Sequence, residues 1–340
     1  VLVPFANLRL NKKPVKFSVI KIINIVVNVL MNILLIVVFK FGIEAILISN
    51  LVASVITFIV LLPDIIPNIK LKFNRKLFDE LIKFSLPYIP AGISANIIQV
   101  INRPLMLYLT DESTTGIFTA NYKLGIIMMI FVTMFDFAWR PFFLNNAKDP
   151  EAKKLFSKVT TIFVVTGSLI CLVTSVFLND IILIFGSSYR TGQYIVPVIL
   201  LAYLFNGIYV NLMPGIYFKK KTKYLPYITG VAAIANVICN LLLIPHFNMM
   251  GAAISTLISY IIMAVCLYFV SQKYYKIDYE IGKILFLIFF VSILISGFYY
   301  LDIHNLFFKL LIIVIFVSSV FIVKILKFDS LKQIFVLSKK

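Results

Sequence analysis

The sequence predicts an all-α, polytopic membrane protein, and its composition is the first observation behind this prediction. Of the 340 residues, 61% are apolar and only 14% are charged, and the mean hydropathy is +1.02. An ordinary soluble domain is about half apolar and about one quarter charged. These values exclude a typical soluble protein.

Segment length is the second observation. A helix needs about 20 mostly apolar residues to cross a bilayer, whereas strands of a membrane barrel are about half as long and alternate in polarity. Ten segments fit the helical requirement, so we expect helices. In chain order they are 18–39, 43–62, 85–109, 117–143, 155–177, 194–218, 224–244, 249–270, 284–301 and 306–323.

An internal repeat is the third observation. The segment NVLMNILL, which begins at Asn28, returns 208 residues later as NVICNLLL, which begins at Asn236. Two apolar helices can share leucine and isoleucine by chance, but both copies also carry two asparagines one helical turn apart. The paired asparagines favour a true repeat, and repeated helical halves are typical of membrane transporters.

The position of the repeat predicts how the chain is organised. The second copy lies at the end of a run of six predicted helices, 85–270. No predicted helix precedes the hairpin that contains the first copy. We therefore expect an N-terminally truncated sequence with ten of fourteen helices, built as two pseudo-symmetric six-helix halves plus a terminal pair. The expected parts are 1–62 (the last two helices of the N-terminal half), 63–84 (a cytoplasmic linker), 85–270 (the C-terminal half) and 271–340 (the terminal helix pair and a cytoplasmic tail).

Within the linker, residues 74–84 predict a short amphipathic helix. Leu77, Phe78, Leu81 and Ile82 share one face of such a helix, and charged residues occupy the rest. A helix of this kind suits the membrane interface. It could tether the two halves or serve as a passive connection.

The basic residues predict the orientation in the membrane. Of the 32 lysines and arginines, 27 lie in the termini and in alternate loops, near 63–84, 140–158, 219–223 and 271–283. Because basic loops stay in the cytoplasm, we expect both termini of this chain to be cytoplasmic. The net charge of +18 is then explained by basic cytoplasmic loops that face anionic lipid headgroups. No nucleic-acid partner is therefore expected.

Charged side chains inside the predicted spans are the candidate functional residues, because each costs about 2.5–3.5 kcal/mol near the bilayer centre. Arg103 and Lys123 are expected at matched depth on adjacent antiparallel helices, where they could bind an anionic headgroup or phosphate together. The alternative is that both side chains reach up to the membrane interface. The candidate substrate-binding residues are Arg103, Lys123 and Arg140.

Asp136 lies one turn before Arg140. The simplest interpretation is a local ion pair, and the alternative is that Asp136 carries a coupling proton or sodium ion. The lysines at 219–223 anchor the topology and could also contact a phosphate. Proline in the 194–218 span, at Pro197 and Pro214, favours breaks in the helix, which could serve gating or only packing.

The remaining reactive side chains predict neither a catalytic site nor a metal or cofactor site. Cys171, Cys239 and Cys266 lie in apolar helices without a paired spacing, so we expect them to be packing residues. His246 and His304 are isolated in predicted outward loops.

Several short motifs, in this order, resemble the polysaccharide-flippase (Wzx-type) family of the multidrug/oligosaccharidyl-lipid/polysaccharide exporter superfamily. The similarity covers essentially 1–270. The motifs are LPYIP at 86–90, NR at 102–103, GIFTANYKL at 116–124, AWRPF at 138–142, GIYF at 215–218, KKTKY at 220–224 and the segment 236–253. Relatives generally carry an acidic residue where this chain has Asn102, so no carboxylate role transfers to that position.

The resemblance implies a fourteen-helix fold in the bacterial cytoplasmic membrane. It also implies flipping of undecaprenyl-diphosphate-linked oligosaccharides to the outer leaflet by alternating access, for surface polysaccharide biosynthesis. The implied partners are the lipid-linked oligosaccharide, membrane lipids, and a polysaccharide polymerase and glycosyltransferases.

Two other functions remain open at the level of sequence. A drug or lipid exporter of the same fold would favour buried carboxylates, which are scarce here. A membrane polysaccharide polymerase or ligase would need catalytic groups on a sizeable outward loop. The acidic residues and histidines of the predicted outward loops are instead scattered among five short loops: Glu44, Asp111, Glu112, Asp180, His246, Asp302 and His304. We therefore expect a transporter and not an enzyme.

Overall fold

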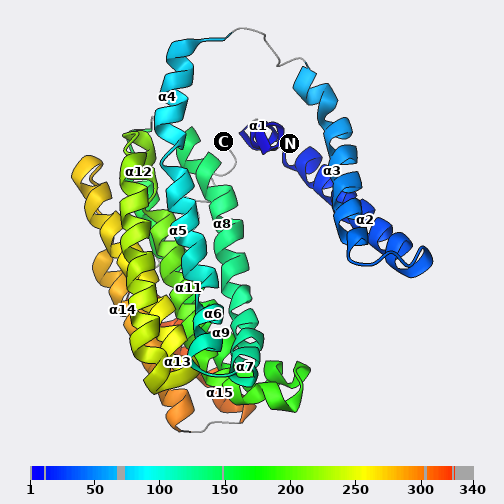
Figure 1. Ribbon diagram of the computed structural model, residues 1–340. Helices are drawn as coiled ribbons and strands as arrows, with labels where there is room; N and C mark the ends of the chain where they lie inside the picture. The colour runs from blue at the N-terminus through cyan, green and yellow to red at the C-terminus, as the bar shows by residue number, and fades with distance from the viewer. Residues whose placement is uncertain are drawn as a thin grey trace. The chain divides into compact units, whose positions relative to one another are not determined.

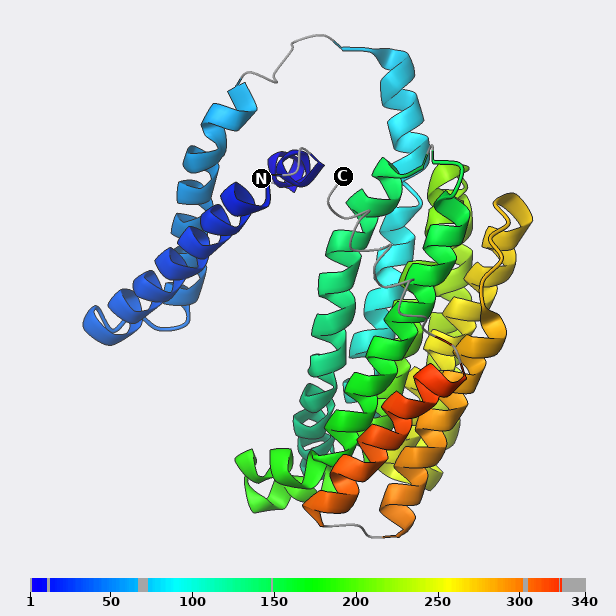
Figure 2. The ribbon, with the colours of Figure 1, turned by 180° about the vertical axis from the view of Figure 1, so that it is seen from behind.

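The computed structural model in Figures 1 and 2 describes residues 2–10, 13–66, 73–147, 149–301, 305–323 and 325. Every regular element in these ranges is helical, which confirms the predicted all-α class. The chain divides into two compact units, Val1–Phe78 and Asp79–Lys340. Each unit is described separately below.

The first unit contains a tightly packed helical hairpin. Its elements are α1 (Leu2–Leu10), α2 (Pro14–Ile33), a π-helical turn η1 (Leu34–Val38) and α3 (Glu44–Ile65). Small buried residues recur every four positions along α3, at Ala45, Ser49, Ala53 and Thr57. Small residues let two membrane helices approach closely. The Asn24 amide of α2 donates to the Ala53 carbonyl at 3.0 Å and to the Thr57 hydroxyl at 2.8 Å.

The amphipathic helix predicted at 74–84 is observed as α4 (Arg75–Ser85), with no buried side chain. The Asn74 side chain accepts a hydrogen bond from the Leu77 amide at 3.1 Å. Near its end, Glu80 pairs with Lys220, and the Thr222 hydroxyl donates to the Phe84 carbonyl at 2.8 Å. The loop after α12 therefore holds the end of α4 in place.

The second unit is a helical bundle. Its α-helices are α5 (Tyr88–Val100), α6 (Asn102–Leu109), α7 (Glu112–Tyr122), α8 (Ile126–Asn145), α9 (Ala152–Val176), α10 (Leu178–Ile181), α11 (Val196–Asn211), α12 (Pro214–Phe218), α13 (Leu225–Tyr274), α14 (Ile281–Tyr300) and α15 (Leu306–Ile322). Short 3₁₀ segments lie between them: η3 (Lys123–Gly125), η4 (Ile182–Ile184), η5 (Ser187–Ile195) and η6 (Thr222–Tyr224). Helices α14 and α15 both pack against α9 (Figure 2).

Helix α13 consists of two antiparallel arms joined at Asn248. That residue has φ 48° and ψ −129°, which is not helical. The two ends of α13 meet, because the hydroxyls of Tyr224 and Tyr274 lie 2.5 Å apart. The arms therefore correspond to the two spans predicted at 224–244 and 249–270.

The predicted total of ten spans is not confirmed. Eight helices among the described residues are long and apolar enough to cross a membrane, with both arms of α13 counted as one. Helix α15 is apolar but has only 17 residues. The long apolar helices nevertheless fit a multi-pass membrane protein, and the two-half organisation stays a prediction.

Helix α11 occupies the centre of the bundle and contacts α8, α9 and α13. Its buried residues lie on all sides, as expected for a helix surrounded by others. Gly207 permits the closest approach: a Cβ there would lie 2.1 Å from the Phe163 ring. Pro197 stands in the first turn of α11, where its missing N–H costs no hydrogen bond, and Pro214 starts α12 after a break.

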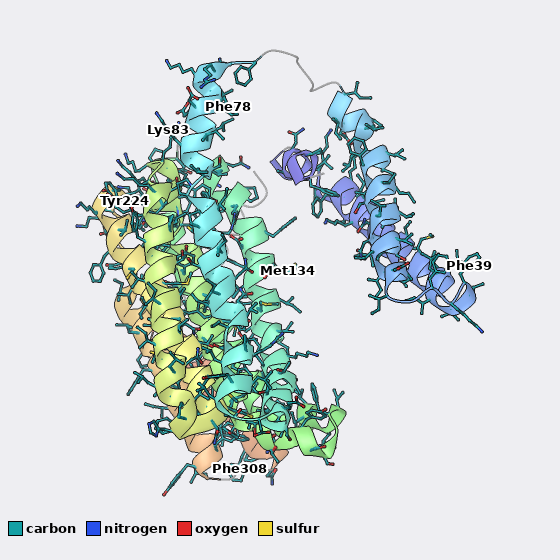
Figure 3. All side chains as sticks on the ribbon, viewed as in Figure 1. Phe39, Phe78, Lys83, Met134, Tyr224 and Phe308 are labelled. Carbon is teal, nitrogen blue, oxygen red and sulfur yellow. The ribbon has the colours of Figure 1, made fainter. Side chains whose placement is uncertain are left out.

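Three of the basic loops gather at one end of the bundle, which we call the basic end (the end of α4, and residues 140–158, 219–224 and 271–283). The Ser157 hydroxyl donates to the Asp278 carbonyl at 2.8 Å, and the rings of Phe218 and Tyr275 lie 5.3 Å apart. Figure 3 shows Lys83 and Tyr224 at this end and Phe308 at the opposite end. The C-terminal tail lies outside the described residues.

Candidate functional site

Arg103 is the second residue of α6, just after the break at Ile101 that separates α5 from α6. Pro104 contributes to this break, because it has no amide hydrogen to donate to the preceding turn. Adjacent helical residues point about 100° apart. Asn102 is consequently buried, with 1% of its surface exposed, whereas Arg103 is exposed.

Behind Arg103 is a fully buried group of polar side chains, which we call the amide cluster (Asn102, Asn236, Asn240 and Thr256). Asn102 donates to the Thr256 hydroxyl at 2.7 Å and accepts from the Asn240 amide at 2.9 Å. The cluster therefore ties α6 to both arms of α13. Two of its atoms, Asn236 Nδ2 and Asn240 Oδ1, have no hydrogen-bond partner among the described residues.

The same asparagine geometry occurs in both copies of the repeat. In the second copy, the Asn240 amide donates to the main-chain and side-chain oxygens of Asn236, at 2.9 and 3.0 Å. In the first copy, the Asn32 amide donates to the same two oxygens of Asn28, at 2.8 and 2.9 Å. The repeat found in the sequence thus has a structural counterpart, although the first pair is only half-buried.

A row of buried tyrosines continues the polar layer across the unit. The hydroxyls of Tyr122 and Tyr203 lie 3.1 Å apart, and the ring of Tyr203 lies 5.8 Å from that of Tyr260. Arg103 itself forms no hydrogen bond or ion pair with any residue that the structure describes, so its guanidinium is available to a ligand.

Lys123 lies in the 3₁₀ segment η3 between α7 and α8, and its side chain is exposed. It lines an open hollow of about 570 Å³ together with residues of α6 and α7, with Phe185, and with Tyr189 of η5. Arg103 does not line this hollow. Helices α6 and α7 are neighbours, as predicted, but the two cations do not share one pocket.

Asp136 and Arg140 form a bidentate ion pair on α8, with N–O distances of 2.8 Å on both sides of the guanidinium. A third guanidinium nitrogen lies 3.4 Å from the Tyr217 hydroxyl. The carboxylate neutralises most of the Arg140 charge, which makes Arg140 a weaker anion ligand than Arg103. An ion-coupling role for Asp136 stays a prediction.

The other candidate groups are dispersed. The three cysteines are free, with Cys171 buried, and His246 is exposed. Asp302 and His304 lie outside the described residues. No group of three or more His, Cys, Asp or Glu residues that could hold a metal ion occurs in the part of the chain that the structure describes.

Sequence reasoning missed the amide cluster and the tyrosine row. The spacing of Asn236 and Asn240 signalled a repeat, but nothing in the sequence paired Asn240 with Asn102. The sequence did not indicate that Tyr203 and Tyr260 pack together, because single tyrosines are common in membrane helices.

Comparisons with known proteins agree with this fold. A family model described as "Polysaccharide biosynthesis protein" matches residues 2–135. No curated protein sequence matches the chain.

Two solved membrane-protein structures resemble the chain. The first is a mutant of the MATE transporter VcmN from Vibrio cholerae, with a TM-score of 0.66 and 15% identity over 79% of this chain. The second is the lipid II flippase MurJ in an inward closed conformation, with a TM-score of 0.54 and 17% identity over 92% of this chain. The matches cover 64% and 69% of those two chains.

These results confirm the resemblance predicted from the sequence motifs. The chain has a fold similar to those of a MATE transporter and a lipid II flippase, and residues 2–135 match a polysaccharide biosynthesis family.

Proposed function

We propose that this protein transports a lipid-linked oligosaccharide, carried on undecaprenyl diphosphate, across the bacterial cytoplasmic membrane by alternating access. The match of residues 2–135 to a polysaccharide biosynthesis family is the observation that carries this proposal. Likeness to a lipid II flippase supports it, since that protein's name states a lipid-linked substrate. A polymerase and glycosyltransferases would act on the same glycan.

The charges within the bundle favour an anionic substrate. Arg103 and Lys123 are exposed and have no described partner, whereas Asp136 is engaged by Arg140. A pyrophosphate carries negative charge, and a guanidinium can bind two phosphate oxygens at once, which an ammonium group cannot reproduce. Arg103 is therefore the proposed primary contact, Lys123 a second contact, and Arg140 a weaker one.

The proposed orientation puts the basic end in the cytoplasm, because basic loops remain on that side. Both termini of this chain would then also be cytoplasmic. Arg103 and Lys123 would lie nearer the outer leaflet, where they would receive the diphosphate as the glycan crosses.

A drug exporter of the same fold is the second candidate, because the MATE transporter has the higher TM-score. Exported cations would require an acidic site. In the described spans, Asp136 is the carboxylate closest to such a role, and its pairing with Arg140 weighs against it.

Transport in vesicles distinguishes the two functions. The protein is reconstituted into liposomes containing either a fluorescent undecaprenyl-diphosphate-linked oligosaccharide or a cationic dye. We expect protein-dependent movement of the lipid-linked glycan and none of the dye. Movement of the dye alone would reject the proposal in favour of a drug exporter.

A further inference from the structure

One group of side chains at the basic end is not used by the proposed transport site. Tyr224, at the start of α13, meets Tyr274, at its end. Their rings lie 5.5 Å apart and their hydroxyls 2.5 Å apart. Because these residues are 50 positions apart in the chain, only the hairpin shape of α13 brings them together.

Three lysines converge on this tyrosine pair. The ammonium groups of Lys221 and Lys273 lie 5.1 and 6.0 Å from the Tyr274 ring centroid. That of Lys223 lies 5.3 Å from the Tyr224 centroid. The Tyr224 hydroxyl lies in the field of all three ammonium groups.

These three positive charges have no anionic partner among the described residues. Lys221, Lys223 and Lys273 form no ion pair with any residue that the structure describes, whereas neighbouring Lys220 pairs with Glu80. Like charges held close together repel, although contact with the tyrosine ring faces offsets part of this cost. A bound anion would remove the remainder.

We propose that Lys221, Lys223, Lys273, Tyr224 and Tyr274 form a binding site for a phosphate-bearing anion, here called the lysine–tyrosine site. Each ammonium group offers hydrogen-bond donors and a point charge to phosphate oxygens. One tyrosine hydroxyl donates to the other, so the second hydroxyl hydrogen is free to donate to the ligand.

The position of the site indicates the source of the phosphate. Tyrosine and lysine at the end of a membrane span lie at headgroup depth, and anionic lipids attract lysines near the membrane surface. An anionic phospholipid headgroup at the basic end is therefore the expected ligand, and free phosphate is the other source of the same chemistry.

Lipid binding to the purified, intact chain tests the site. The protein is titrated in detergent with phosphatidylglycerol and, separately, with phosphatidylcholine, and bound lipid is counted by native mass spectrometry. We expect tighter binding of phosphatidylglycerol. The variant Lys221→Gln/Lys223→Gln/Lys273→Gln should weaken that binding by roughly ten- to a hundredfold, because it removes the charge-assisted hydrogen bonds to the phosphate, and Tyr274→Phe should weaken it partially.

A matched control removes the same amount of charge from the same end. Lys154→Gln/Lys219→Gln/Lys276→Gln changes three other exposed lysines of the basic end. It should leave phosphatidylglycerol binding within about twofold, because it loses only the diffuse surface attraction. Equal losses in the two triple variants, or equal binding of the two lipids by the native chain, would overturn the proposal. Displacement of the lipid by millimolar inorganic phosphate would assign the site to free phosphate, and persistence of the lipid would assign it to the headgroup.

Discussion

The amide cluster allows a prediction that uses the repeat as its own control. Asn240 and Asn32 occupy equivalent positions, and each amide bonds both oxygens of the preceding asparagine. Only Asn240 also donates across helices, to Asn102 at 2.9 Å. Replacing each by alanine therefore removes the same local bonds and differs in one buried interhelical bond.

The cost of Asn240→Ala follows from that difference. An interhelical hydrogen bond in a membrane protein contributes about 0.6 kcal/mol on average and about 1.7 kcal/mol at most. The substitution also leaves the buried Asn102 oxygen unpaired, which costs about 1–3 kcal/mol. A total of about 2–5 kcal/mol corresponds to a fall in melting temperature of roughly 4–20 °C for a unit of this size.

Intrinsic tryptophan fluorescence measures this loss of stability in the second structural unit, which contains Asn240. Trp139 is the single tryptophan; it is 2% exposed and stacks on Phe135 with ring centroids 5.6 Å apart. Its emission reports unfolding of the second unit. Asn240→Ala should lower that transition, and the shape-matched Asn240→Leu should lower it as well, while Asn32→Ala should leave it unchanged.

An equal shift of the tryptophan transition in Asn240→Ala and Asn32→Ala would show that the bond from Asn240 to Asn102 does not stabilise the second unit. A shift below about 1 °C in Asn240→Ala would also refute the prediction, since it would mean that the cluster contributes less than a single average interhelical bond.

Three further predictions concern orientation, ion pairing and packing. Cysteines introduced at Lys153 and Lys220, in a background without native cysteine, should resist membrane-impermeant thiol reagents in intact cells; labelling at both would place the basic end outside. Asp136→Asn should lower the melting temperature by roughly 1–3 °C, because a half-exposed ion pair is worth about 0.2–1 kcal/mol. The substitution should not change how strongly transport depends on an imposed ion gradient. Loss of that dependence would instead make the Asp136 carboxylate the coupling site. Gly207→Ala should cost about 1–3 kcal/mol through overpacking, measured by the same fluorescence transition, whereas Gly230→Ala, with nothing within 4 Å of the added Cβ, should be neutral or stabilising.

Much of the fold was predictable because the length of an apolar segment, and the polar residues that interrupt it, can be read locally from the sequence. The hairpin at Asn248 was visible as an interruption between two apolar runs, and α4 as an amphipathic segment. The break at Lys123–Gly125 was not, because a short 3₁₀ segment keeps the same polarity pattern as the helices beside it. The break at Ile101 was not predicted either, because proline, here Pro104, is too common in membrane helices to be decisive.

The site was less predictable because side-chain direction depends on tertiary packing. Arg103 and Lys123 were expected on adjacent helices, and α6 and α7 are neighbours. Whether two such side chains enter one pocket depends on helix rotation, which the sequence does not set. Likewise, the contact of Asn102 with Asn240 joins residues 138 positions apart and leaves no trace in either segment alone.

The flipping rate of Arg103 variants directly tests whether this guanidinium binds the diphosphate of the proposed substrate. A fluorescent undecaprenyl-diphosphate-linked oligosaccharide is followed in vesicles that contain equal amounts of each protein. Loss of a charge-assisted contact of about 1.5–3 kcal/mol predicts that Arg103→Ala flips this lipid roughly 10- to 150-fold more slowly. Arg103→Lys should recover part of the rate, and Tyr108→Ala, on the same helix and 83% exposed, should match the native protein. If Arg103→Ala flips the lipid at the rate of the native protein, Arg103 does not bind the substrate.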